Sequence, residues 1–146
     1  MIWLLRHGEA EQGEPDFDRR LTEKGERQSR DAGKALAALG VEIEVCLASP
    51  RARARDTAAL ACEALGVEVT IDDRLSGGRF DALELTAGLH SVLLVGHEPD
   101  FSDAIAELTG ARLDMKKGGL AAVHDRALRV LLRPKETRSI ATVDGS

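Results

Sequence analysis

The sequence predicts an α/β domain of three layers, with helices on both faces of a mostly parallel central sheet. Short apolar runs such as Ile2–Leu5 and Ser91–Val95 alternate along the chain with longer segments of helical character. These runs are apolar at every position, which is typical of strands buried on both faces. A chain of 146 residues is long enough to form one domain with a substantial core.

Local signals place the expected elements in order. Thr22 is a candidate N-cap and Gly40 a stop for the first helix, while Pro50 suits the first turn of the second helix and Gly66 follows its end. We expect strands at 2–5, 41–48, 67–71, 91–95, 120–123 and 127–132, and helices at 22–39, 49–65, 80–87 and 99–108.

The end of the chain has a different character. A tight turn at Asp125 and Arg126 joins the last two expected strands. The polar segment that follows indicates a folded domain at 1–132 and a peripheral C-terminal tail at 133–146.

Composition limits the possible partners. The net charge of −5 argues against a nucleic-acid or anionic-membrane surface, and four aromatic residues without any Tyr offer few platforms for stacking bases. Cys46 and Cys62 lie within apolar segments and are interpreted as buried thiols. The sequence shows neither a secretory signal nor a run of membrane-spanning length, so we expect a cytoplasmic protein with no nucleic-acid and no membrane partner.

Polar residues follow several of the expected strands. Arg6 and His7 come directly after the first strand, His97 comes after the fourth, and Ser49 follows the second. In open α/β sheets, ligands bind beyond the carboxyl ends of the strands. We therefore expect these separate segments to deliver their side chains to one edge of the sheet.

Two histidines beside an arginine favour a phosphate pocket over a metal site. The cationic side chain of Arg6 would repel a metal ion, and no cysteine or nearby carboxylate completes a ligand set. Guanidinium groups, in contrast, present forked donors to phosphoryl oxygens. No metal and no cofactor are expected.

The RARAR run contributes a further arginine. On a helix, Arg51 and Arg55 share one face, and Arg53 projects roughly 200° away from Arg51. Arg53 in the first turn is suited to hold a phosphate at the positive end of the helix, which leaves Arg51 and Arg55 as solvated surface charges. Periodicity alone leaves open which face points inward.

Four motifs in this order resemble the histidine phosphatase superfamily. They are LLRHGEA, RRLTEKGERQ, ASPRARARDTA and LLVGHEP, and the similarity extends from Met1 to about Val123. The short segment between the third and fourth strands makes the chain most similar to the SixA-type phosphohistidine phosphatases.

The resemblance implies a phosphoglycerate mutase-like fold and specific roles for matching residues. His7 would be the nucleophile that takes the phosphoryl group, while Arg6, Arg53 and His97 would hold its oxygens. Arg19, just ahead of the Leu-Thr element, would lie near the pocket. These roles agree with physical chemistry, because nearby guanidinium charges lower the pKa of a histidine and keep it neutral for attack.

The resemblance does not identify a residue that would serve as the general acid. Asp73, Asp81 and Glu84 are available, but none lies in a recognisable motif, and surface positions are the alternative interpretation. A phosphoramidate needs less help from an acid than an alkyl phosphate does, so the sequence favours protein phosphohistidine as the substrate.

Two alternatives to a phosphohistidine phosphatase remain. One is a phosphatase or mutase that acts on a small phosphorylated metabolite, and the other is a phosphate-binding module without turnover. The expected partner is accordingly a phosphorylated protein or a small phosphorylated substrate.

Overall fold

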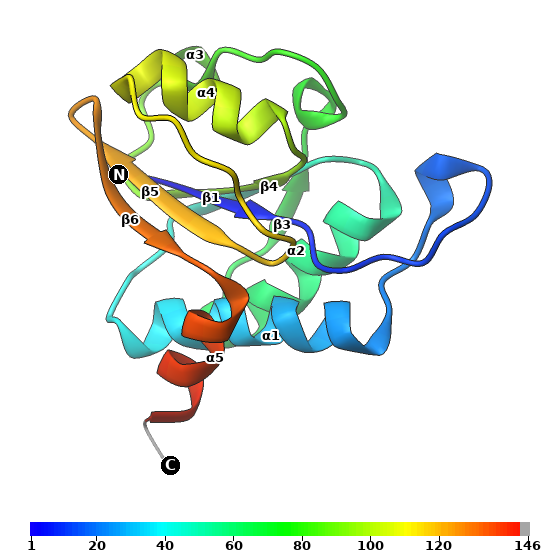
Figure 1. Ribbon diagram of the computed structural model, residues 1–146. Coiled ribbons are helices and arrows are strands. Elements are labelled where there is room, and N and C mark those ends of the chain that lie inside the picture. The colour runs from blue at the N-terminus through cyan, green and yellow to red at the C-terminus, as the bar shows by residue number, and fades with distance from the viewer. Residues whose placement is uncertain (144–146) are drawn as a thin grey trace.

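The computed structural model describes residues 1–143, which form a central sheet between two layers of helices (Figure 1). The expected three-layer α/β architecture is confirmed. The strands are β1 (Ile2–Arg6), β2 (Val45–Ala48), β3 (Val69–Ile71), β4 (Val92–Gly96), β5 (Leu120–His124) and β6 (Ala127–Leu132). The helices are α1 (Glu23–Ala38), α2 (Ala52–Leu65), α3 (Ala82–Leu85), α4 (Asp100–Thr109) and α5 (Pro134–Val143), with short 3-10 turns η1 (Asp16–Asp18) and η2 (Asp73–Leu75).

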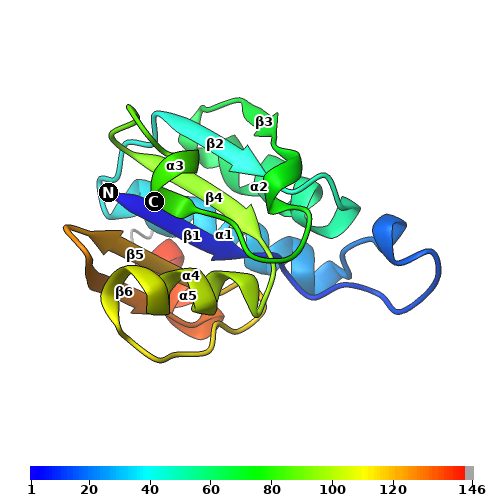
Figure 2. The ribbon, with the colours of Figure 1, turned by 90° about the horizontal axis from the view of Figure 1, so that it is seen from above.

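The sheet is mostly parallel, with strand order β3-β2-β4-β1-β5-β6. β1 to β4 run parallel to one another, β5 runs antiparallel to β1, and β6 runs antiparallel to β5. Arg6 pairs with Gly96, and Ala48 pairs with Val95, so β1, β2 and β4 end at the same edge. Figure 2 shows their arrowheads side by side there, with the loop that carries η1 extending from this edge.

Both faces of the sheet are covered by apolar side chains. Trp3 and Leu5 belong to a core shared with α1 and α2, whereas Leu4 belongs to a second core shared with α4. Successive residues of a strand point to opposite faces, so apolar residues are required at the consecutive positions Trp3, Leu4 and Leu5 of β1. This arrangement explains the continuous apolar runs of the sequence.

Helices α1 and α2 pack closely on the first face. Gly33 of α1 lies against the backbone of Ala61 in α2, where a Cβ atom at position 33 would overlap the carbonyl oxygen. The glycine is therefore required by the close approach of the two helix backbones.

The predicted signals at Thr22, Gly66 and the Asp125–Arg126 turn are confirmed. The Thr22 side chain accepts a hydrogen bond from the backbone N–H of Gly25, and Gly66 takes a left-handed conformation with φ of 67° after α2. Asp125 and Arg126 have φ angles of 51° and 58°, as the tight turns of two-residue hairpins require.

Some element boundaries differ from those expected. β2 begins at Val45 instead of Val41, because the N–H of Val41 donates to the Leu36 carbonyl and closes the end of α1. Helix α2 begins at Ala52, so Pro50 lies ahead of the helix, and its N-cap Arg51 has an extended backbone. The helix expected around 80–87 is a single turn.

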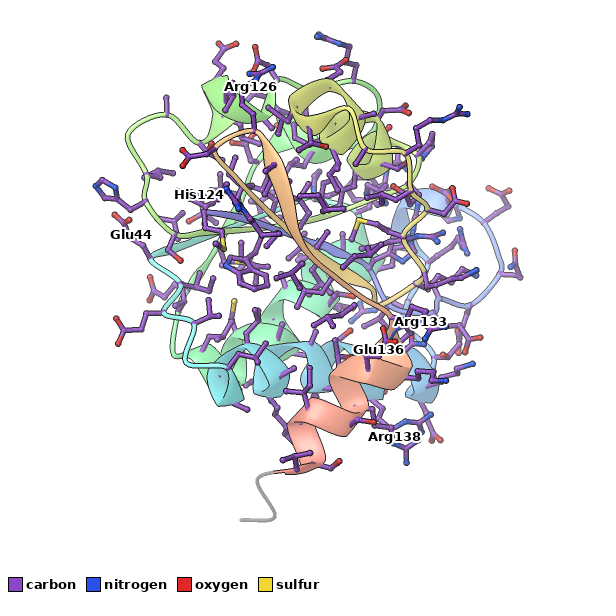
Figure 3. The ribbon with its side chains drawn as sticks, turned by 60° about the vertical axis from the view of Figure 1, so that its left-hand side comes forward. Glu44, His124, Arg126, Arg133, Glu136 and Arg138 are labelled. Carbon is purple, nitrogen blue, oxygen red and sulfur yellow. The ribbon has the colours of Figure 1, made fainter. Side chains whose placement is uncertain are left out.

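The C-terminal segment contains a helix that the sequence analysis does not predict. α5 packs beside α1, and the side chain of Thr137 is fully buried. Arg133 and Glu136 form an ion pair of 2.6 Å where α5 begins, and Arg138 points outward from the helix (Figure 3). Because most residues of α5 are polar, the sequence pattern does not predict this helix. The division of the chain at residue 132 stays a prediction, and residues 144–146 of the expected tail lie outside the described part.

Candidate active site

Two imidazoles meet at the carboxyl edge of the sheet. His7 follows β1, His97 follows β4, and the centroids of their rings are 5.3 Å apart. Arg6 ends β1, and Arg53 lies in the first turn of α2. His7 and His97 are each 7% exposed and Arg53 is 8% exposed, so the structure brings these expected residues into one nearly buried group.

The ring of His7 is held in one tautomer. Its Nδ1 lies 2.7 Å from the carbonyl oxygen of Gly8. A carbonyl oxygen only accepts hydrogen bonds, so Nδ1 carries the proton and Nε2 keeps its lone pair. Burial, together with the charges of Arg53 and Arg6, lowers the pKa of His7 to about 3. The ring is therefore neutral at pH 7, with a free nucleophilic nitrogen.

His97 is also neutral and is joined to the start of α2. Its Nε2 forms a hydrogen bond of 2.8 Å with the hydroxyl of Ser49. The same hydroxyl accepts the backbone N–H of Arg51 at 3.2 Å. Burial, followed by the charges of Arg53 and Arg51, lowers the pKa of His97 to about 4.

Arg6 has an unused donor. Its Nη1 donates to the carbonyl oxygen of Met115 at 2.8 Å, but its buried Nε has no hydrogen-bond partner within residues 1–143. Burial lowers the pKa of Arg6. A buried unpaired N–H is costly, because the donor has lost water without gaining an acceptor.

Thr57 connects the segment after β1 to the first turn of α2. Its hydroxyl accepts the backbone N–H of Gly8 at 3.0 Å and donates to the carbonyl oxygen of Arg53 at 2.7 Å. Ser29 contributes a further contact of 3.2 Å. Thr57 and Ser49 both lie in the ASPRARARDTA motif; Ser49 was expected at this edge of the sheet, whereas Thr57 was not singled out. Their position in that motif was the feature of the sequence that could have pointed to a structural role.

The Leu-Thr element fastens the loop after His7. The N–H of Thr22 donates to the carbonyl oxygen of Glu9 at 3.0 Å, and its hydroxyl donates to the Glu9 carboxylate at 2.8 Å. Gly25 lies against the backbone of Glu9 and leaves no room for a Cβ atom. This motif therefore holds the segment that follows His7.

Asp16, a carboxylate that the sequence does not single out, lies beside Arg53. Asp16 binds Arg53, Arg51 and Arg19 through its side chain, at 3.3, 2.7 and 3.1 Å. Arg19 is thus close to Arg53 across Asp16, and no hydrogen bond of Arg19 with either histidine is found among the described residues. The side chain of Arg19 lowers the pKa of Asp16 most strongly.

The interpretation of Arg51 as a solvated surface charge is wrong. Its side chain is 29% exposed and is held by Asp16 and by the carbonyl oxygen of Ser76. The helical-face argument failed because Arg51 is the non-helical N-cap of α2. Arg55, one turn further along the helix, is exposed as expected.

The three acid candidates lie elsewhere. Asp73, Asp81 and Glu84 line a shared hollow beside α3, and the side chain of Asp81 caps that helix by accepting the N–H of Glu84. Asp73 and Glu84 are exposed. Within residues 1–143, no hydrogen bond joins any of these carboxylates to Arg6, His7, Arg53 or His97.

Two further features concern metals and membranes. No three His, Cys, Asp or Glu side chains in the described part of the chain are grouped to hold a metal ion. None of the helices within residues 1–143 has both the length and the apolarity needed to cross a bilayer.

An α/β/α fold that gathers two neutral imidazoles and two guanidinium groups at the end of its parallel strands defines a phosphate-handling class of protein. The family model of the histidine phosphatase superfamily (branch 1) matches residues 2–139. The chain belongs to this superfamily.

Individual relatives agree with this assignment. An uncharacterized protein of Picosynechococcus sp. is 37% identical over 145 residues, covering 88% of this chain and 87% of the relative. A 2,3-bisphosphoglycerate-dependent phosphoglycerate mutase of Methylobacterium sp. is 38% identical over 71 residues, which is 45% of this chain and 34% of the mutase.

Solved structures of SixA proteins share the fold. The structure described as phosphohistidine phosphatase SixA from Agrobacterium tumefaciens has a TM-score of 0.81 and 26% identity, covering 91% of this chain and 97% of that one. The protein histidine phosphatase SixA complexed with tungstate has a TM-score of 0.79 and 26% identity, covering 92% and 97%.

Proposed function

We propose that this protein is a phosphohistidine phosphatase that works through a covalent phosphohistidine at His7. The observation that carries the proposal is the locked ring of His7, whose Nδ1–H is bound to Gly8 while Nε2 stays unprotonated beside His97. A group that only bound phosphate would not need a neutral nucleophilic nitrogen.

The chemistry proceeds in two displacements. In the first, the free ring nitrogen of the substrate phosphohistidine takes a proton from solvent, Nε2 of His7 attacks phosphorus, the bond from phosphorus to the substrate nitrogen breaks, and the substrate leaves as neutral imidazole. In the second, water attacks the phosphoryl group, the bond to Nε2 breaks, and inorganic phosphate is released. Arg6, Arg53 and His97 hold the equatorial oxygens, where charge accumulates in the transition state.

The surroundings of the site favour a phosphoramidate substrate. The pKa of Asp16 is lowered by its arginine partners, which makes it a poor proton donor at neutral pH. Glu98, after His97, accepts the backbone N–H groups of Ser102 and Met115 at 2.7 and 3.1 Å. An alkoxide needs a proton to leave, whereas the imidazole of phosphohistidine is a better leaving group. Protein phosphohistidine therefore suits this site better than a sugar phosphate.

The comparisons support the same substrate class. Both similar structures are of SixA proteins, and the one described as a protein histidine phosphatase is complexed with tungstate, a tetrahedral oxyanion. The mutase relative keeps an alternative open, namely a phosphatase or mutase for a small metabolite, because it is 38% identical over 71 residues of this chain.

A substrate panel tests the proposal. We expect wild-type protein to release phosphate from a phosphohistidine protein at least about tenfold faster than from a hexose phosphate, with an aryl phosphate in between. Equal rates on the hexose phosphate would favour the small-metabolite alternative.

Labelling of the nucleophile separates an enzyme from a binding module. Brief exposure to a substrate labelled in its phosphoryl group should label the wild-type chain and not His7→Asn. The matched control His124→Asn changes a half-exposed histidine in the β5–β6 hairpin and should be labelled normally. A wild-type chain that neither takes up label nor turns over substrate would be a phosphate-binding module.

A further inference from the structure

The Asp16 carboxylate fills a site made of cations although it lies on an exposed loop. Its side chain in η1 is 49% exposed. Oδ2 accepts from Arg51 Nη1 at 2.7 Å and from Arg53 Nη2 at 3.3 Å, and Oδ1 accepts from Arg19 Nη1 at 3.1 Å. We refer to Arg19, Arg51 and Arg53 as the arginine cluster. The cluster therefore binds both oxygens of a carboxylate in this structure.

The arginine cluster has partners that do not depend on this carboxylate. Arg19 Nε donates to the carbonyl oxygen of Glu11 at 2.7 Å, and Arg51 Nε donates to that of Ser76 at 2.6 Å. Arg53 Nη1 donates to the backbone carbonyl oxygen of Asp16 at 3.0 Å. Because the main chain orients each guanidinium, a different anion could replace the carboxylate without dismantling the cluster.

The arginine cluster adjoins the proposed phosphate pocket. Arg53 belongs to both, and the backbone N–H of Arg51 reaches the Ser49 hydroxyl that is bonded to His97. The charges of Arg51 and Asp16 both act on the His97 ring. A phosphoryl group held by Arg53 and His97 would therefore have a second anion position directly beside it.

We propose that the arginine cluster is a second anion-binding subsite, which takes an anionic group attached close to the phosphoryl group of the substrate. Asp16 is its exchangeable internal occupant and moves into solvent when the ligand binds. Arg51 is the residue that determines this specificity. The subsite rests on the proposed function, because it assumes that the neighbouring pocket receives a phosphoryl group.

The chemistry required of the ligand is two oxyanions close together. An acidic side chain next to the phosphohistidine of a protein would supply the second one, and so would a second phosphate of a small molecule. Each would form charge-assisted bonds to planar, forked donors, as Asp16 does.

Binding of two phosphonates to the full chain tests the subsite by calorimetry. Methylphosphonate carries one anionic group, and methylenediphosphonate carries two. We expect wild-type protein to bind the diphosphonate about tenfold more tightly. Arg51→Gln should abolish this preference, whereas the matched control Arg55→Gln, on an exposed arginine one turn along α2, should keep it.

Removing the charge of Asp16 tests whether a ligand displaces this carboxylate from the arginine cluster. Asp16→Asn should bind the diphosphonate about three- to tenfold more tightly than wild type, because the ligand no longer displaces a charged partner. Asp18→Asn makes the same change of charge at an exposed position of the same 3-10 turn and should leave the affinity unchanged. Weaker binding by Asp16→Asn would show that the carboxylate orients the arginines, and would overturn the proposal.

The outcomes separate the subsite from the pocket. Binding of methylphosphonate without any preference for the diphosphonate overturns the subsite and leaves the phosphate pocket standing. Failure of both phosphonates to bind contradicts the pocket as well.

Phosphohistidine peptides identify the source of the second anion. A lower KM for a peptide with a neighbouring Asp than for its Asn counterpart, lost in Arg51→Gln, assigns the subsite to an acidic protein substrate. A preference confined to the diphosphonate assigns it to a small molecule with two anionic groups. If Arg51→Gln changes neither preference, the subsite is contradicted.

Discussion

The hydroxyl of Thr57 accepts the backbone N–H of Gly8 at 3.0 Å, across 49 residues of sequence. Through this bond and its donation to the Arg53 carbonyl, one buried side chain sets the distance between the end of β1 and the start of α2. The proposed nucleophile and the proposed phosphate donor are therefore placed by the same group.

Replacing Thr57 should damage both stability and activity. In Thr57→Val the Gly8 N–H becomes a buried donor without an acceptor, which costs about 1–3 kcal/mol of unfolding free energy. We expect kcat to fall with it, because His7 is no longer held against α2. Denaturant unfolding and steady-state kinetics measure the two effects. Thr57→Ser keeps the hydroxyl and should retain most activity, so equal damage in both variants would contradict this role.

The buried histidines should make the protein sensitive to acid. His7 has a pKa of about 3 in the folded protein and about 6.5 in an unfolded chain, so the unfolded state takes up a proton first as the pH falls. The unfolding free energy should therefore decrease below about pH 6.5, by up to about 1.4 kcal/mol per pH unit from this group.

Variants isolate the contribution of His7 to that pH dependence. Urea unfolding of His7→Gln between pH 7.5 and 5 should show a smaller loss than wild type. His124→Gln, which removes a half-exposed imidazole, should follow the wild-type curve. An unchanged slope in His7→Gln would show that the imidazole is not held neutral by burial.

Arg53 should tolerate no conservative replacement. A lysine in Arg53→Lys keeps the charge but lacks the planar fork that would serve a phosphoryl oxygen and Asp16 together. We expect kcat/KM to fall about 100-fold. Arg55→Lys is the control, because Arg55 is exposed and its nearest acidic partner, Asp56, is 3.7 Å away. Comparable kinetics in the two variants would remove Arg53 from the site.

The close packing of α1 on α2 should fail when a methyl group is added. Gly33→Ala places a Cβ atom against the carbonyl oxygen of Ala61, and overpacking of this kind costs about 1–3 kcal/mol. The exposed neighbour Lys34→Ala should leave the unfolding free energy nearly unchanged. Thermal or urea unfolding distinguishes the two, and a Gly33→Ala protein as stable as Lys34→Ala would contradict the contact.

Much of the fold follows from local patterns in the sequence. The apolar runs predict strands buried on both faces, and residues such as Thr22 and Gly66 mark helix ends because their side chains or conformations act on neighbouring backbone groups. Local patterns do not predict helix α5, because its contact with α1 is made between segments that are distant in sequence and mostly polar.

By itself, the sequence determined that Arg6, His7 and His97 stand at the ends of parallel strands, because strand direction follows from the order of buried runs and crossover helices. Only the tertiary structure decided the tautomer of His7, the missing partner of Arg6 Nε, and the meeting of Asp16 with Arg51 and Arg53. Periodicity describes neighbours along one element. The charge and hydrogen bonding of a site depend on which distant backbones the packing of the whole chain brings within about 3 Å.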